Sequence, residues 1–136
     1  MIQKQISESQ LDEIVKLMVN PNAIMNLDEN DIRYVLEGKS GFLYVAEQAD
    51  EDHQTFMAKT FEELSEQSAV KECHYLLMNI GTSTDDPITM DDMDIINDFL
   101  ATLFNDVMEV KWGMTKNAPG QKMTIQVLCT NELQRE

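Results

Sequence analysis

The chain contains few glycines and no glycine-rich motif. Its 136 residues include five glycines, Gly38, Gly41, Gly81, Gly113 and Gly120. None of them falls in the spacing of a P-loop or of a dinucleotide-binding fingerprint, in which glycine lets the backbone approach phosphate groups closely. We therefore expect this chain to hold no nucleotide in a phosphate-binding loop of its own.

Basic residues are also scarce. The sequence has 10 lysines and arginines against 25 aspartates and glutamates, so its formal net charge is -15 at pH 7. A protein of this charge is repelled by a phosphate backbone and by anionic lipid headgroups. Nucleic acids and membrane surfaces are therefore excluded as expected partners.

Cysteine, histidine and long apolar runs are rare as well. Cys73 and Cys129 both lie inside apolar segments, where a free thiol packs as a small hydrophobic group in a reducing compartment. His53 and His74 have no second ligand at metal-binding spacing.

No segment approaches the ~20 apolar residues of a membrane span, and the first ten residues lack the apolar block of a signal peptide. We expect a cytoplasmic protein.

Hydrophobic residues make up 43% of the sequence, which suffices for the core of one domain. Apolar periodicity and turn residues predict helices and strands in a fixed order. The expected elements are a helix over residues 7–19, a short helix over 28–38, a strand over 41–46, a helix over 52–66, a buried strand over 73–80, a helix over 89–103, and strands over 108–112 and 123–129. The turn at residues 116–120 predicts that the last two strands form an antiparallel hairpin.

This order predicts an α/β fold of the two-layer α+β type. We expect a mixed four-stranded sheet with two packed helices, preceded by the end of a longer helix and by a short helix. In the helix over residues 89–103, Thr89 is the predicted N-cap, and the aspartates are expected mostly on the solvated face. These aspartates are Asp91, Asp92, Asp94 and Asp98.

An acidic turn separates the two opening helices. Residues 26–31 read NLDEND, which fits the pattern N-x-D-x-x-D, and they follow LDEIVKLMVNP and precede DIRYVL. Further along, LLMNIGTS, VKWGMT and MTIQVLCT fall on predicted strands. These segments resemble the C-terminal domain of the FtsZ/tubulin family over residues 11–130. The family's glycine-rich phosphate loop, which belongs to its N-terminal GTPase domain, is absent.

The resemblance implies a division of the chain and a site. Residues 1–20 would be the end of the family's central helix and residues 21–136 its C-terminal domain. The acidic loop would reach the GTP site of a neighbouring FtsZ-like subunit, either a copy of the chain or a homologue. There Asn26 would orient groups, while Asp28 and Asp31 would act in trans on water or on a cation. GTP and Mg²⁺ would belong to that partner, with no cofactor bound by this chain alone.

The residues of the loop also allow simpler interpretations. Asp28 is a good N-cap, and Asp31 would then lie in the first helical turn, where negative charge is favoured. Asn26, Asp28, Asn30 and Glu37 are spaced as in an EF-hand calcium loop, but Asp31 stands where that loop needs glycine. Capping is therefore the main alternative to a catalytic contribution.

Three functions stay open at this point. The first is a filament-interaction domain, either part of a longer FtsZ-like GTPase or a short relative that docks on one. The second is a regulator that caps filament ends, slightly favoured by Glu29 and Asn30, which replace the family's usual Phe-Ala pair. The third is a small enzyme or ligand-binding domain on a similar fold, for which the sequence offers no nucleophile and base pair.

Overall fold

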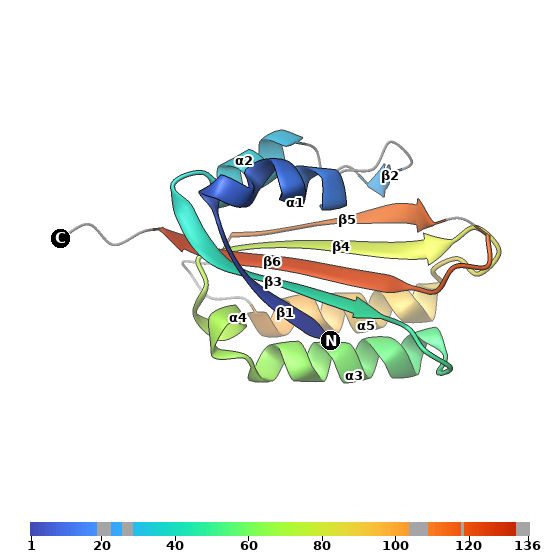
Figure 1. The fold of residues 1–136 in the computed structure, drawn as a ribbon. Helices are drawn as coiled ribbons and strands as arrows, with labels where there is room; N and C mark the ends of the chain where they lie inside the picture. Colours follow the sequence, from blue (N-terminus) through green and yellow to red (C-terminus); the bar gives the residue numbers. More distant parts are fainter. Residues whose placement is uncertain (19–22, 26–28, 104–108, 118, 133–136) are drawn as a thin grey trace.

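The computed structural model describes residues 1–18, 23–25, 29–103, 109–117 and 119–132. They form six strands, five α-helices and one 3₁₀ turn (Figure 1). In chain order these are β1 (Ile2–Ser7), η1 (Glu8–Gln10), α1 (Leu11–Met18), β2 (Ala23–Met25), α2 (Glu29–Leu36), β3 (Lys39–Glu47), α3 (His53–Glu66), α4 (Ser68–Glu72), β4 (Tyr75–Ser83), α5 (Met90–Leu103), β5 (Glu109–Asn117) and β6 (Thr124–Glu132).

All six strands belong to one mixed sheet with the order β1-β3-β6-β4-β5-β2. β4 pairs with β5 in parallel, and every other neighbouring pair is antiparallel. β4 lies inside the sheet, between β6 and β5, and nearly all its residues are buried. The prediction that this apolar run forms a strand buried on both faces is confirmed.

The predicted fold class is confirmed, but the predicted sheet was too small and one pairing was wrong. The sheet has six strands, because β1 and β2 extend it at its two edges. β5 and β6 do not form the predicted hairpin, since β4 lies between them. The helix α5 connects β4 to β5, and a connection of that length allows the two strands to lie parallel. The strand β4, whose residues are nearly all buried, therefore lies in the interior of the sheet.

Other boundaries differ at the start of the chain and after α3. Residues 2–7 form β1, so the helix expected over residues 7–19 begins as the 3₁₀ turn η1 and becomes α-helical at Leu11. The short helix α4 was not predicted. α1 and α2 cover one face of the sheet and α3, α4 and α5 the other (Figure 1). The helices therefore form a layer on each face instead of a single layer.

The face under α3, α4 and α5 holds the larger hydrophobic core. The rings of Phe61 in α3 and Phe99 in α5 stack with centroids 4.3 Å apart and planes 5° from parallel. Met57, Met78 and Met123 are fully buried in this core. Asp52 caps α3, because its carboxylate accepts a hydrogen bond from the backbone N–H of Thr55 at 2.7 Å.

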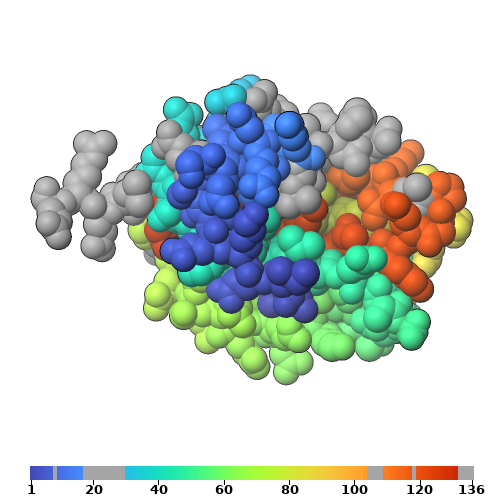
Figure 2. Space-filling view, in the orientation of Figure 1, coloured from blue at the N-terminus to red at the C-terminus, as the bar shows by residue number. Residues whose placement is uncertain are grey.

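A smaller core lies under α1 and α2. Ile14, Ile32 and Leu36 from the two helices pack against Leu77 and Leu128 of the sheet. In the space-filling view, β1 and α1 (blue) lie at the front over part of the visible face, and α3 and α4 (green) lie below them (Figure 2). None of the helices in the described ranges is long and apolar enough to cross a bilayer.

Candidate functional site

The acidic segment leads into α2, and of its three predicted site residues the structure describes Asp31. Asp31 lies in the first turn of α2, where the free N–H groups of the helix favour a negative charge. Its side chain is 16% exposed. Asn26 and Asp28 lie outside the described residues, so their roles, including the capping of α2 by Asp28, stay predictions. Because residues 29–36 are helical, the twelve residues 26–37 do not form an EF-hand loop.

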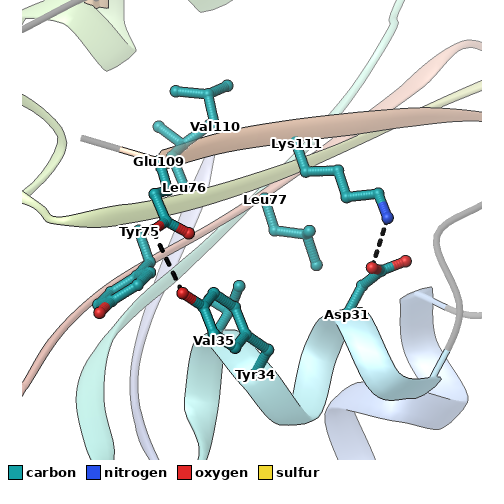
Figure 3. Close-up of a pocket in the computed structure, with 9 residues that line it drawn as sticks. All are labelled: Asp31, Tyr34, Val35, Tyr75, Leu76, Leu77, Glu109, Val110 and Lys111. Carbon is teal, nitrogen blue, oxygen red and sulfur yellow. Dashed lines mark hydrogen bonds and ion pairs between the residues drawn. The ribbon is translucent and has the colours of Figure 1, made fainter.

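Asp31 borders a groove between α2 and the strands β4 and β5 (Figure 3). The groove has a volume of about 270 Å³. It is lined by three side chains of α2 and by consecutive residues of the two strands, namely Asp31, Tyr34, Val35, Tyr75, Leu76, Leu77, Glu109, Val110 and Lys111. Aliphatic side chains line much of it, and the charged groups come from α2 and β5.

Two polar bridges connect α2 to β5 across this groove. The Lys111 ammonium donates to Oδ1 of Asp31, forming an ion pair in which the lysine side chain is 54% exposed. The hydroxyl of Tyr34 donates to Oε1 of Glu109 at 3.2 Å. Both bridges are drawn in Figure 3. The start and the middle of α2 are therefore each tied to the neighbouring strand.

The end of α2 is fixed by a lysine and two aromatic rings. Lys39 donates to the backbone carbonyls of Tyr34 at 2.9 Å and of Glu37 at 3.1 Å, and its Nζ lies 4.8 Å from the ring centroid of Tyr75. Gly38, with a φ of +70°, ends the helix in the left-handed conformation that glycine adopts at low cost. The helix that carries Asp31 is thus held at both of its ends.

The charged side chains of the groove do not suit the binding of a nucleoside triphosphate. Asp31 and Glu109 bring two carboxylates to it and Lys111 one cation, and phosphate sites instead rely on backbone N–H groups and an excess of positive charge. No group of three metal-ligating side chains occurs within the described residues.

A second polar cluster joins the first turns of α3 and α5. His53 Nδ1 lies 3.3 Å from Oδ2 of Asp92, and its Nε2 lies 3.1 Å from Oδ2 of Asp86. Asp92 also accepts from the backbone N–H of Thr89, whose hydroxyl accepts from the N–H of Asp92. The predicted cap at Thr89 is confirmed as a capping box. Asp92 is 2% exposed, so it departs from the solvated face expected for the aspartates of this helix.

The two cysteines are free and buried, in agreement with the prediction of core thiols. The Cys73 thiol donates to the backbone carbonyl of Val70 at 3.3 Å, and the Cys129 thiol donates to that of Phe42 at 3.6 Å. The neighbouring Cys73 side chain and burial raise the pKa of Cys129. Burial raises the pKa of the nearby Tyr44 hydroxyl to about 12, so this phenol is neutral at physiological pH. Nothing in this cluster resembles a reactive cysteine site, which needs partial exposure.

The partners of Asp31 and Tyr34 were not predicted from the sequence. Lys111 and Glu109 lie 80 and 75 residues further along the chain, and no local spacing connects them with α2. Only the parallel pairing of β4 and β5 brings the start of β5 beside this helix. The prediction paired β5 with β6 instead of with β4, so the groove could not be foreseen.

No protein-family model and no curated protein sequence matches the chain. Solved structures do resemble it. An FtsZ dimer from M. jannaschii aligns over 90% of this chain with a TM-score of 0.60 and 10% identity. A GTPγS-form protofilament of TubZ from Bacillus thuringiensis serovar israelensis aligns over 90% of the chain with a TM-score of 0.60 and 16% identity.

The chain spans about a third of the length of these proteins, 36% of the FtsZ chain and 34% of the TubZ chain. At 10% and 16% identity the likeness concerns the fold. The predicted resemblance to the FtsZ/tubulin family is therefore confirmed at the level of the fold, and the coverage agrees with a C-terminal FtsZ-like domain. The chain has an FtsZ/tubulin-like fold.

Proposed function

We propose that this domain takes part in subunit–subunit contacts of FtsZ-type filaments in bacterial cell division. In this proposal it offers residues 26–31 to the GTP site of a neighbouring subunit, which holds the GTP and Mg²⁺. The neighbour is an FtsZ-like protein, either a homologue or the GTPase part of a longer protein that contains this domain. The contact takes place in the cytoplasm, and the domain alone hydrolyses nothing.

The observation that carries the proposal is the position of Asp31 in an FtsZ/TubZ-like fold. The predicted acidic residue lies in the first turn of α2, on a helix fixed at both ends and beside an accessible groove. Both similar structures are assemblies, a dimer and a protofilament by their descriptions. A rigid support of this kind is what a contribution in trans requires, because misplacement by about 1 Å is costly in catalysis.

The proposed contribution of residues 26–31 to GTP hydrolysis is limited to orienting groups at the neighbour's site. Hydrolysis of GTP depends mainly on the orientation of the attacking water and on stabilisation of charge, with little covalent work for the protein. Asp31, together with Asn26 and Asp28 by resemblance, would supply such orientation to a nucleotide bound elsewhere. The neighbour's own residues and Mg²⁺ would supply the phosphate contacts.

A second candidate is a regulator that caps filament ends without assisting hydrolysis. The ion pair between Asp31 and Lys111 favours it, because the negative charge of Asp31 is already compensated within the domain. Such a domain would occupy the end of a filament, contribute no active carboxylate and block the next subunit. The two candidates share the docking contact and differ in the effect on GTP turnover.

The experiment that tests the proposal titrates the domain into FtsZ from the organism that encodes it. GTP turnover and polymer length are measured for the wild-type domain and for an Asp28→Ala/Asp31→Ala double variant. Stimulated turnover that the double variant loses supports a contribution in trans. Shortened polymers with reduced turnover support capping.

The matched control is Asp94→Ala/Asp98→Ala, which removes the same charge from two exposed positions of α5 on the opposite face of the sheet. It is expected to act as the wild-type domain does. If neither turnover nor polymer length responds to the wild-type domain at any ratio, the proposed filament contact is wrong.

A further inference from the structure

Lys111 lies across the groove from Asp31 and is the more accessible half of their ion pair. Its side chain starts on β5 and brings Nζ to the Asp31 carboxylate on α2 (Figure 3). The lysine side chain is 54% exposed, whereas that of Asp31 is 16% exposed. A partner that docks at this groove therefore meets the ammonium group together with the carboxylate.

The pair compensates the charge on which the proposed function depends. A carboxylate that accepts a hydrogen bond from an ammonium group has one oxygen occupied, and its field is largely cancelled at short range. A pair exposed to this degree is nevertheless weak, because water and salt screen it. A divalent cation or a basic side chain from a docking subunit can compete with Lys111 for the same oxygen.

We propose that Lys111 is a regulatory residue of this site, which holds Asp31 in a charge-compensated state and so sets how far the domain assists a neighbour's GTP hydrolysis. The inference rests on the proposed filament contact. While the pair is closed, the domain docks and assists hydrolysis weakly. When the pair opens, the Asp31 carboxylate can orient the attacking water.

The step affected is hydrolysis of the neighbour's GTP. Water attacks the γ-phosphorus, the bond between the γ-phosphorus and the β–γ bridging oxygen breaks, and GDP, phosphate and a proton are released. An orienting carboxylate acts on the attacking water and is not consumed. Lys111 therefore changes the rate of this step through Asp31 without taking part in the bond changes.

If Lys111 instead contacted the neighbour's phosphates directly, its removal would change GTP turnover in the opposite direction. A lysine that itself contacts the neighbour's phosphates would stabilise the negative charge of the transition state, and its removal would slow turnover. A lysine that only restrains Asp31 would, on removal, speed turnover. The sign of the change therefore separates the two roles.

The test combines co-sedimentation with FtsZ polymers and GTP turnover, using FtsZ from the organism that encodes the chain. Lys111→Met keeps the length of the side chain and removes its charge. Lys116→Met is the matched control, since it removes an exposed charge from the same strand but on the opposite face of the sheet. The double variant Lys111→Met/Asp31→Asn tests whether the effect passes through Asp31.

We expect Lys111→Met to co-sediment as the wild-type domain does. It should raise the turnover measured with the domain about two- to fivefold, the factor that corresponds to opening one ion pair whose lysine is half-exposed. Lys116→Met and the double variant should give no rise. Co-sedimentation without a rise, or with a fall in turnover, overturns the role of Lys111 and leaves the filament contact standing. If the wild-type domain itself does not co-sediment, the proposed function fails and the inference fails with it.

Discussion

The face of the sheet under α3, α4 and α5 is packed more extensively than the face under α1 and α2. The first holds the larger core and the stacked pair of Phe61 and Phe99. The second holds a smaller core, and beside it lies the groove that is bridged by Asp31 and Lys111. We therefore expect the first face to supply most of the stability of the fold, while the second face presents the candidate site. Variants on the two faces should therefore affect different measurements.

The largest effect on stability is expected at Phe61. Phe61→Ala removes a ring that is 5% exposed and stacked on Phe99, so it leaves a large cavity between α3 and α5. We expect a loss of about 3–5 kcal/mol in the free energy of unfolding, measured by urea denaturation. A loss below about 1 kcal/mol would show that this face does not carry the stability assigned to it.

A smaller loss is expected at Leu77 on the other face. Leu77 is fully buried but borders the groove, so water can enter the space that Leu77→Ala creates. We expect a loss of about 2–3 kcal/mol in the free energy of unfolding by the same method, in the lower part of the range for buried leucines. A loss larger than that of Phe61→Ala would reverse the comparison between the faces.

The third prediction concerns pH and the first turn of α3. The hydrogen bond from the backbone N–H of Thr55 holds the pKa of Asp52 below its usual value of 3.8. A carboxyl group whose pKa is lower in the folded state contributes stability above pH about 4 and loses it as the pH falls through the folded-state pKa. The wild-type domain should therefore lose this contribution at acidic pH.

Asp52→Asn is the matched variant, because asparagine is also a good N-cap but does not titrate. Its free energy of unfolding should fall less steeply than that of the wild-type domain as the pH decreases from about 5 to 2, when both are measured by urea denaturation. Identical pH profiles would mean that Asp52 contributes nothing to the acid sensitivity of the fold.

The smallest effect on stability is expected at Lys111. Lys111→Met should change the free energy of unfolding by less than about 1 kcal/mol, because the lysine side chain of the ion pair is half-exposed and water screens its charge. Urea denaturation of this variant beside Lys116→Met measures the difference. A much larger loss would make the Asp31–Lys111 pair part of the structural framework, contrary to the separation of stability and site.

Much of the fold follows from local sequence patterns. The apolar run before Gly81 identifies the central strand β4, and Thr89, three residues before Asp92, identifies the start of α5. β1 was missed because most of its residues are polar and exposed, so its sequence carries little of the alternation that marks a half-buried strand. β1 lies at the edge of the sheet, and Ile6 is its buried apolar residue.

The surroundings of the candidate site residue Asp31 were not predicted. The acidic motif identifies Asp31 by its spacing, but the residues that hold it come from β5 and depend on which strands pair. Asp92 was expected with the other aspartates of this helix, mostly on the solvated face, but contacts with His53 and Thr89 bury it. Long-range polar contacts of this kind carry no periodic signal along the chain.

The measurement that tests the central claim most directly is photocross-linking from a nucleotide. FtsZ loaded with 8-azido-GTP is polymerised with the domain, irradiated and digested, and the labelled peptides are identified by mass spectrometry. If residues 26–31 lie over a neighbour's nucleotide, the label appears on the domain peptide that contains Asp31, and Asp94→Ala/Asp98→Ala leaves it there. If the domain co-sediments with the polymer but carries its label elsewhere or carries none, the proposed placement of this loop is wrong.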